Sequence, residues 1–432
     1  MKTQSNYRWF VIAVFFFFML LHQADKLLIG PLTTPIMEHF NLNRAQMGFV
    51  TSGALLVGAI FYPLWGYLYD RYARAKLLAL ASLVWGATTW FSAIAPTYPT
   101  FLASRASTGI DDSSYPGLYS LISDYFIPQV RGKIYGLLEL TMPIGYLLGM
   151  ILGIFLGGAV GWRGVFYITG SLGILLAVVI FFTIREPARG KSEPELADIE
   201  QVGSYHFDWQ TARNLFKKRG LRLLFIQGFF GVFPWNVITY WFFNYLETER
   251  GYDQNAVFFT MVVAVLVLAA GYPLGGALGD YFFQRSPRGR MWVAATGVIT
   301  GAIMLTITLS VPHENQGLFL ILLAITAIFI PFAAPNVVST VHDVTLPEVR
   351  STALSIQYLL ESSGAALAPG IAGLIADATS LKSAFLIICV STWVLCFIFF
   401  LLAARVVPHD IATLRQQLRQ RADYERSLQA NP

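Results

Sequence analysis

The sequence predicts an all-α membrane protein whose twelve transmembrane helices form two pseudo-symmetric six-helix bundles. Three observations support this fold class: the composition, twelve long apolar stretches and an internal repeat. Of the 432 residues, 55% are hydrophobic and only 13% are charged, whereas soluble domains carry about 25% charged residues. The chain is therefore predicted to be an integral membrane protein.

Each apolar stretch approaches the roughly 20 residues that a helix needs to cross a bilayer. The predicted spans are 8–37, 45–69, 76–95, 99–126, 132–158, 163–184, 221–246, 255–283, 290–311, 316–343, 349–377 and 382–404. The first span is long and aromatic and contains LHQADK. It is therefore interpreted as a retained helix and not as a cleaved signal peptide.

A polar segment divides the chain between its sixth and seventh spans. The predicted domains are an N-terminal bundle (1–185), a cytoplasmic central loop (186–220), a C-terminal bundle (221–404) and a cytoplasmic tail (405–432). Lysine and arginine concentrate on one side if both termini are cytoplasmic, as the positive-inside rule requires. We expect the inner (plasma) membrane of a bacterium as the location. In the tail, Ile411, Leu414 and Leu418 share one side, which predicts a helix lying on the membrane surface.

The two halves carry related sequences. SDYFIPQVRGKIYGLL (123–138) aligns with VHDVTLPEVRSTALSI, so that Asp124 matches Asp343 and Arg131 matches Arg350. GYLYDRYARAK (66–76) is more weakly similar to 276–290, and this alignment pairs Asp70 with Asp280. Such a repeat is typical of transporters built from two parallel halves, with the substrate path between them.

The charges in these repeats predict a conformational latch. Gly66 allows two helices to approach closely, and Asp70 at a helix end can pair with cations or with a helix N-terminus. The predicted latch residues are Gly66, Asp70, Arg71, Arg74, Asp124, Arg131, Asp280, Asp343 and Arg350. The alternative is a charge cluster that only sets topology; its recurrence in both halves favours a two-state latch.

Charged residues also lie within the first and fourth spans. These are Asp25 and Lys26 in the first, and Arg105, Asp111 and Asp112 in the fourth. Each costs roughly 2.5–3.5 kcal/mol at the bilayer centre, so a shared, water-filled cavity with mutual pairing is predicted. At about 1.5 Å per residue, Asp25 and Asp112 lie at similar depth. Asp111 points about 100 degrees away from Asp112 on a regular helix, so Asp112 is the favoured cavity residue.

Functional roles follow from these positions. The predicted proton-coupling residues are Asp25, Asp112 and Glu139. The predicted substrate-binding residues are Lys26, Arg105, Tyr115, Asn236, Tyr240, Gln357 and Glu361. A buried network that only fixes packing is the alternative for the charged groups. Gly145, Gly149, Gly153 and Gly157 form a small-residue stripe, which we expect to pack against the span 255–283.

The motif at 66–76 resembles the signature of the major facilitator superfamily, G-x-L-x-D-R-x-x-R-R/K. The match comprises Gly66, Leu68, Asp70, Arg71, Arg74 and, one place late, Lys76. Together with the twelve spans and the repeat, the resemblance covers essentially the whole chain. It implies the major facilitator fold and transport by alternating access.

Two branches of that superfamily are similar to this chain. Anion:cation symporters carry N-Y-x-D-R in helix 1 and R-x6-E in helix 4, and Spinster-like lysolipid transporters carry a similar D-R pair and R-x3-G-x-G-E-A-S-Y. The matching positions here are Asp25, Lys26, Arg105, Gly109, Asp112, Ser114 and Tyr115. Lys26 stands for the usual arginine, Asp112 for glutamate, and His22-Gln23 for Asn-Tyr. These departures leave the substrate open.

The predicted function is proton-coupled secondary active transport of an organic anion or an amphipathic, lysolipid-like molecule. The alternatives are a transporter-fold receptor or scaffold without proton-driven transport, and a proton-coupled drug exporter. No phosphate-binding loop, metal-ligand spacing or nucleophile motif is present in the sequence, so no enzyme activity, cofactor or metal is expected. The expected partners are a small-molecule or lipid-like substrate, protons and membrane lipids, with no nucleic acid, for a monomeric chain.

Overall fold

The computed structural model describes residues 2–42, 44–196 and 209–430, and all regular elements in these ranges are helical. The helices before the central loop are α1 (Lys2–Leu27), α2 (Thr33–Phe40), α3 (Arg44–Arg71), α4 (Arg74–Ile94), α5 (Tyr98–Ser107), α6 (Gly109–Asp112), α7 (Tyr115–Ser123), α8 (Pro128–Glu139), α9 (Thr141–Ile151) and α10 (Gly157–Thr183). The others are α11 (Trp209–Asn214), α12 (Arg219–Thr248), α13 (Gln254–Phe283), α14 (Gly289–Leu309), α15 (Gln316–Phe329), α16 (Ala333–Asp343), α17 (Arg350–Ala378), α18 (Leu381–Phe385) and α19 (Ser391–Ala430).

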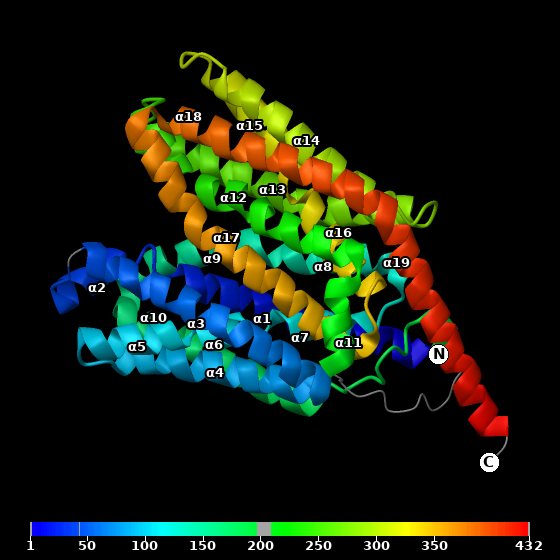
Figure 1. Ribbon diagram of the computed structural model, residues 1–432. Coiled ribbons are helices and arrows are strands. Elements are labelled where there is room, and N and C mark those ends of the chain that lie inside the picture. Colours follow the sequence, from blue (N-terminus) through cyan, green and yellow to red (C-terminus); the bar gives the residue numbers. More distant parts are fainter. Residues whose placement is uncertain (1, 43, 197–208, 431–432) are drawn as a thin grey trace.

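The helices form two groups, which confirms the predicted all-α fold (Figure 1). The groups approach each other at the end of the molecule where the chain begins and ends, and their ribbons diverge toward α2 and α18. Across the two halves, α3 packs against α17 and α8 packs against α13. These two contacts are equivalent in the internal repeat, so the halves meet by the same surfaces.

Ten stretches of the described residues are long and apolar enough to cross a membrane. Three of them join consecutive helices, α8 with α9, α15 with α16, and α18 with α19. The other two predicted spans, 45–69 and 99–126, correspond to α3 and to the series α5, α6 and α7. The fourth span is therefore divided, and this division shapes the site.

The C-terminal tail continues α19 and packs against the protein. Leu414 and Leu418 are fully buried and pack against Leu346, so the predicted position on the membrane surface was wrong. Arg415 Nη1 lies 2.6 Å from a Glu193 carboxylate oxygen. This ion pair, together with the buried leucines, holds the tail helix on the protein.

Candidate functional site

The division of the fourth span turns two neighbouring carboxylates toward α1. The hydroxyl of Thr108 donates to Arg105 O at 2.7 Å, and the Ser113 hydroxyl donates to Ile110 O at 2.9 Å. Such side-chain bonds compete with the helical ladder, and here they lie on either side of the single-turn helix α6. Gly109 is required at this point, because a Cβ there would lie 2.1 Å from Ala54 O of α3.

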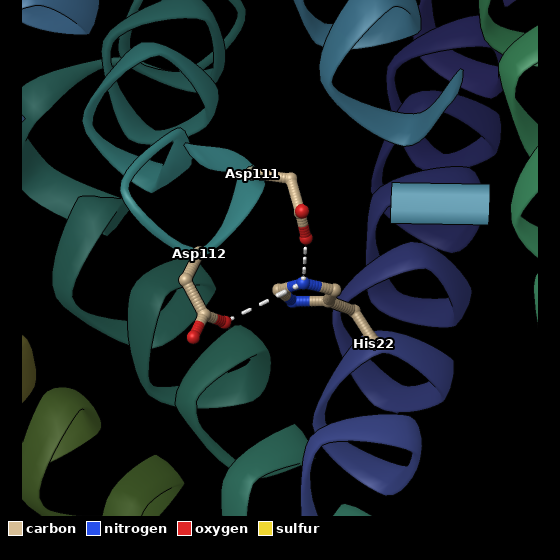
Figure 2. A group of neighbouring side chains, drawn as sticks. All are labelled: His22, Asp111 and Asp112. Carbon is tan, nitrogen blue, oxygen red and sulfur yellow. Dashed lines mark hydrogen bonds and ion pairs between the residues drawn. The ribbon is translucent and has the colours of Figure 1, made fainter. Parts of the chain in front are cut away.

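Both acids of α6 reach the same histidine (Figure 2). His22 Nε2 lies 2.6 Å from Asp111 Oδ2 and 3.5 Å from Asp112 Oδ1. The prediction that Asp111 points away from the cavity residue Asp112 was wrong. It assumed a regular helix, and the fourth span is broken at α6. His22 was not among the predicted site residues. Its spacing offered a signal, since it precedes Asp25 and Lys26 by three and four residues and so shares their helix face.

The other ring nitrogen of His22 binds a tyrosine. His22 Nδ1 lies 2.6 Å from the Tyr115 hydroxyl, to which Gln23 Nε2 donates at 3.4 Å. The imidazole also packs edge-on against the Trp85 ring at 5.3 Å between ring centroids. His22 is 3% exposed, so both of its nitrogens depend on these protein partners.

Lys26 pairs with Asp112 at the rim of this group. Its Nζ lies 2.9 Å from Asp112 Oδ2, and the Lys26 side chain is 40% exposed. Asp112 therefore lies between the ammonium group of Lys26 and the imidazole of His22. The pair links a buried histidine to an accessible cation.

Asp25 points in another direction, into the first helical group. Its carboxylate accepts hydrogen bonds from Trp85 Nε1 at 3.1 Å, Thr89 Oγ1 at 3.1 Å and Thr169 Oγ1 at 2.5 Å. Arg105 Nη1 lies 3.7 Å from Asp25 Oδ2. Asp25 and Asp112 thus have different basic partners, and Trp85 is the residue that contacts both Asp25 and His22.

Arg105 retains hydrogen-bonding capacity. It is 5% exposed, its guanidinium lies 5.3 Å from the centre of the Phe166 ring, and within the described chain its Nη1 has no hydrogen-bond acceptor. The 3.7 Å separation from Asp25 is an ion pair too long to be a hydrogen bond.

We call His22, Asp25, Lys26, Arg105, Asp111 and Asp112 the intramembrane cluster.

The glycine stripe of the fifth span positions α1. A Cβ at Gly145 would lie 2.6 Å from Gln23 Cβ, and one at Gly149 would lie 2.6 Å from Ala24 O. The stripe therefore packs against α1, and the predicted contact with the span 255–283 was wrong. Spacing alone identified a close-packing surface but could not identify the helix that fills it.

The other predicted site residues lie along several helices. The Tyr119 hydroxyl donates to Glu139 Oε1, and Gln357 Nε2 donates to Glu361 Oε1 at 2.7 Å. Asn236 donates to Val232 O of its own helix at 2.8 Å. The side chain of Tyr240 lies outside the described residues. The structure does not bring Glu139, Gln357 or Glu361 into hydrogen-bond or ion-pair contact with the intramembrane cluster.

A second group of charges joins the two halves. Arg350 Nη1 lies 3.4 Å from Asp124 Oδ1, and Arg131 Nη1 lies 3.5 Å from Asp343 Oδ1. An acid of each half therefore pairs with an arginine of the other half. All four side chains are buried.

Two more acids bind the starts of helices in the opposite half. Asp70 accepts hydrogen bonds from the backbone N–H groups at 351–352, at 2.7–3.0 Å. Asp280 accepts them from the N–H groups at 132–133, at 2.8–3.1 Å. The first turns of a helix favour negative charge, so both contacts stabilise the approach of the halves.

Each exchanged acid also has an arginine from its own half. Arg74 Nη1 lies 2.7 Å from Asp124 Oδ2, and Arg290 pairs with Asp343. Arg290 was not among the predicted residues, although it follows Asp280 in the aligned segment. Arg71, which was predicted, lies on the surface and contacts Tyr67 of its own helix.

Glu193, from the central loop, lies between the exchanged arginines. One of its carboxylate oxygens pairs with both Arg131 and Arg350, and the other pairs with Arg415. Burial alone would raise the pKa of Glu193, but Arg131, Arg350 and Arg415 hold it well below its ordinary value. The interhalf network is defined as Asp70, Arg74, Asp124, Arg131, Glu193, Asp280, Arg290, Asp343 and Arg350.

His22, Asp111 and Asp112 also fit the spacing of a metal site. One ligand atom from each lies within 4.8 Å of the others. However, both ring nitrogens of His22 already have protein partners, and Lys26 occupies one oxygen of Asp112. A metal ion would have to displace the His22–Asp111 hydrogen bond, so the arrangement suits a proton better.

The chain matches the family described as Major Facilitator Superfamily over residues 14–311 and 261–428. It is 28% identical over 396 residues to Protein spinster of Drosophila melanogaster, covering 88% of this chain and 63% of that protein. The chain thus spans less than two thirds of the length of that relative. It is 26% identical over 397 residues to the Cis,cis-muconate transport protein of Acinetobacter baylyi, covering 89% of this chain and 91% of the relative.

Among solved structures, the chain is similar to a bacterial homolog of the human lysosomal transporter Spinster in an inward-facing and unoccupied conformation. The TM-score is 0.59 at 22% identity, and the match covers 95% of this chain and 98% of the other. This similarity shows a shared fold. The two branches that the sequence motifs resemble are therefore both represented among the relatives.

Proposed function

Because the chain belongs to the Major Facilitator Superfamily, a family of transporters and not of enzymes, we propose that it is a proton-coupled secondary active transporter. It moves an organic anion or an amphipathic, lysolipid-like molecule by alternating access. The halves 1–185 and 221–404 act as the two moving bundles. The family supplies the transporter class, and the charged groups of the chain support the choice of substrate.

The main support for an anionic substrate is the pair of cations in the intramembrane cluster. Arg105 is buried with one guanidinium nitrogen that lacks an acceptor among the described residues. Lys26, on α1, is partly exposed and pairs with Asp112 of the same cluster. A carboxylate or phosphate would supply the missing acceptor, because charge-assisted hydrogen bonds to such groups are strong.

The interhalf network supports the alternating-access part of the proposal. It holds the halves together at the end of the molecule that carries both termini. With both termini in the cytoplasm of a bacterium, as the distribution of lysine and arginine favours, the network closes the cytoplasmic side. Access then comes from the opposite side in this conformation, and breaking the network opens the cytoplasmic side.

Glu139 and Glu361 favour a second candidate, the export of amphipathic cations. Each carboxylate accepts a hydrogen bond from a neutral group, Tyr119 or Gln357, and neither has an ion pair with a basic residue of the described chain. A ligand with an ammonium group would supply the missing positive charge. Such a ligand would contact α8 and α17, one from each half.

The purified protein in proteoliposomes tests these alternatives. A pH gradient is imposed, and accumulation of cis,cis-muconate, a sugar acid, a lysophospholipid and a cationic amphiphile is measured in parallel. Accumulation of an anionic or lysolipid probe that collapses when the gradient is dissipated supports the proposal. Accumulation of the cationic amphiphile alone favours export of cations. Binding of a probe without gradient-driven accumulation of any would indicate a receptor instead.

A further inference from the structure

We propose that His22 carries the coupled proton, and that Asp111 and Asp112 hold it in place. This inference rests on the proposed transport function and names the group responsible for its coupling. The geometry is specific: Nε2 lies 2.6 Å from Asp111 Oδ2, and Nδ1 lies 2.6 Å from the Tyr115 hydroxyl. Figure 2 shows the two carboxylates of α6 directed at one imidazole.

The hydrogen bonds of His22 are satisfied in both protonation states. Nε2–H donates to Asp111 in the neutral and in the charged ring. Nδ1 accepts from the Tyr115 hydroxyl when the ring is neutral and donates to the same oxygen when it is charged, because a hydroxyl can rotate to serve either role. Proton uptake at Nδ1 therefore reverses one hydrogen bond and breaks none.

The charges around the ring favour a proton there. Asp111 and Asp112 face His22 from α6, Lys26 lies one turn along α1, and Tyr115 faces it from α7. With a neutral ring, two carboxylates are balanced by a single ammonium group. A buried surplus charge is costly, and protonation of His22 removes the surplus. Asp25 and Arg105 pair with each other at 3.7 Å and offset each other's charge, and Arg105 also acts on Asp112.

Asp112 couples the proton to the substrate. It is shared between His22, at 3.5 Å, and Lys26, at 2.9 Å. An anion that binds Lys26 draws it away from Asp112, and the freed carboxylate then favours the charged ring. By linkage the proton favours the anion to the same extent, so the two are carried together in one direction. The ring takes up the proton at Nδ1 on one side of the membrane and releases it on the other side with the anion.

The test compares His22→Asn with His39→Asn in proteoliposomes. His39 is exposed on α2, outside the intramembrane cluster, and its replacement is expected to leave transport unchanged. His22→Asn is expected to reduce pH-gradient-driven accumulation by roughly tenfold, within the 5–150-fold range of typical coupling. Counterflow exchange of the same probe, which needs no net proton movement, is expected to persist and shows that the variant is folded. Gradient-driven accumulation at the wild-type level in His22→Asn overturns the proposal.

A measurement without substrate separates this inference from the proposed function. The protein labelled with ¹⁵N-histidine in lipid nanodiscs is titrated between about pH 5 and 8, where histidine changes charge, and the His22 signal is identified by its loss in His22→Asn. A single titration step that moves in Asp111→Asn supports the proton site. A ring that stays in one protonation state throughout overturns it, even if transport is observed. If the wild type accumulates no probe while His22 titrates, the transport function fails and the proton site remains.

Discussion

Asp124 and Arg350 form a buried ion pair between the two halves of the chain, with carboxylate and guanidinium atoms 3.4 Å apart. Asp343 and Arg131 form the equivalent pair in the opposite direction. The conformation is therefore closed by the same contact made twice. Its strength depends on burial, since removing one partner of a buried pair costs about 3–5 kcal/mol.

Asp124→Asn is expected to weaken this closure. The substitution removes the Asp124 carboxylate from Arg350 and Arg74, which keep Glu193 and Glu186 as their other partners. Because neither arginine is left unpaired, the predicted loss in stability of the closed state is at or below the low end of the range of about 3–5 kcal/mol for a broken buried pair. Reaction of a cysteine introduced at Ser351 with a membrane-impermeant thiol reagent measures the opening. Asp423→Asn is the control, because Asp423 belongs to an exposed pair on α19 and such pairs contribute about 0–1 kcal/mol. Equal reactivity in the two variants would contradict the prediction.

Gly66→Ala is expected to push α3 and α17 apart. A Cβ at this position would lie 2.5 Å from Ser355 Oγ and 2.8 Å from Ser355 Cβ. Overpacking of this kind costs about 1–3 kcal/mol, so the thermal midpoint should fall. Gly301→Ala is the matched control, since a Cβ at Gly301 would lie 3.9–4.0 Å from the nearest atoms, which belong to the Trp393 ring. Recovery of stability in Gly66→Ala combined with Ser355→Gly would assign the loss to this contact.

Glu193 is expected to make closure sensitive to acid. Its pKa is held below the ordinary value of 4.5 by three arginines, so its contribution is present above about pH 4.5 and is lost as the pH falls toward its folded-state pKa. The difference in thermal stability between the wild type and Glu193→Gln should therefore be full at pH 7 and shrink below pH 4.5. A difference that stays constant through this range would show that the charge of Glu193 does not act in this way.

Arg105→Gln is expected to weaken binding of an anionic substrate. A hydrogen bond to a charged group contributes about 1.5–3 kcal/mol, which corresponds to a loss of roughly 10–150-fold in affinity. Ligand-induced thermal shifts at several concentrations measure the change. Arg163→Gln serves as the control, because Arg163 binds the backbone carbonyls of Ala93 and Ala95. An unchanged affinity in Arg105→Gln would show that Arg105 does not bind the substrate.

The fold was predictable because its signals are local and repeated. Apolar stretches give the spans, and the aligned pairs Asp124/Asp343 and Arg131/Arg350 indicate which charges are equivalent. The meeting of His22 with Asp111 was not predictable by helical arithmetic, because it depends on the break at α6, where Gly109 approaches α3. The helix that packs on the glycine stripe was also not predictable. Small residues at a four-residue spacing show a surface for close packing, but the packing of the whole bundle decides which helix lies on it.

The reciprocal ion pairs also bear on how such a chain arose. In an isologous dimer each subunit offers the same acid and the same base, so two identical six-helix chains related by a twofold axis would satisfy both pairs. Gene duplication and fusion therefore required no new charge at this interface. What fusion did add is the connecting segment, and with it Glu193, one oxygen of which pairs with both Arg131 and Arg350. A single acid that serves two symmetry-related bases is a contact that only the fused protein can make.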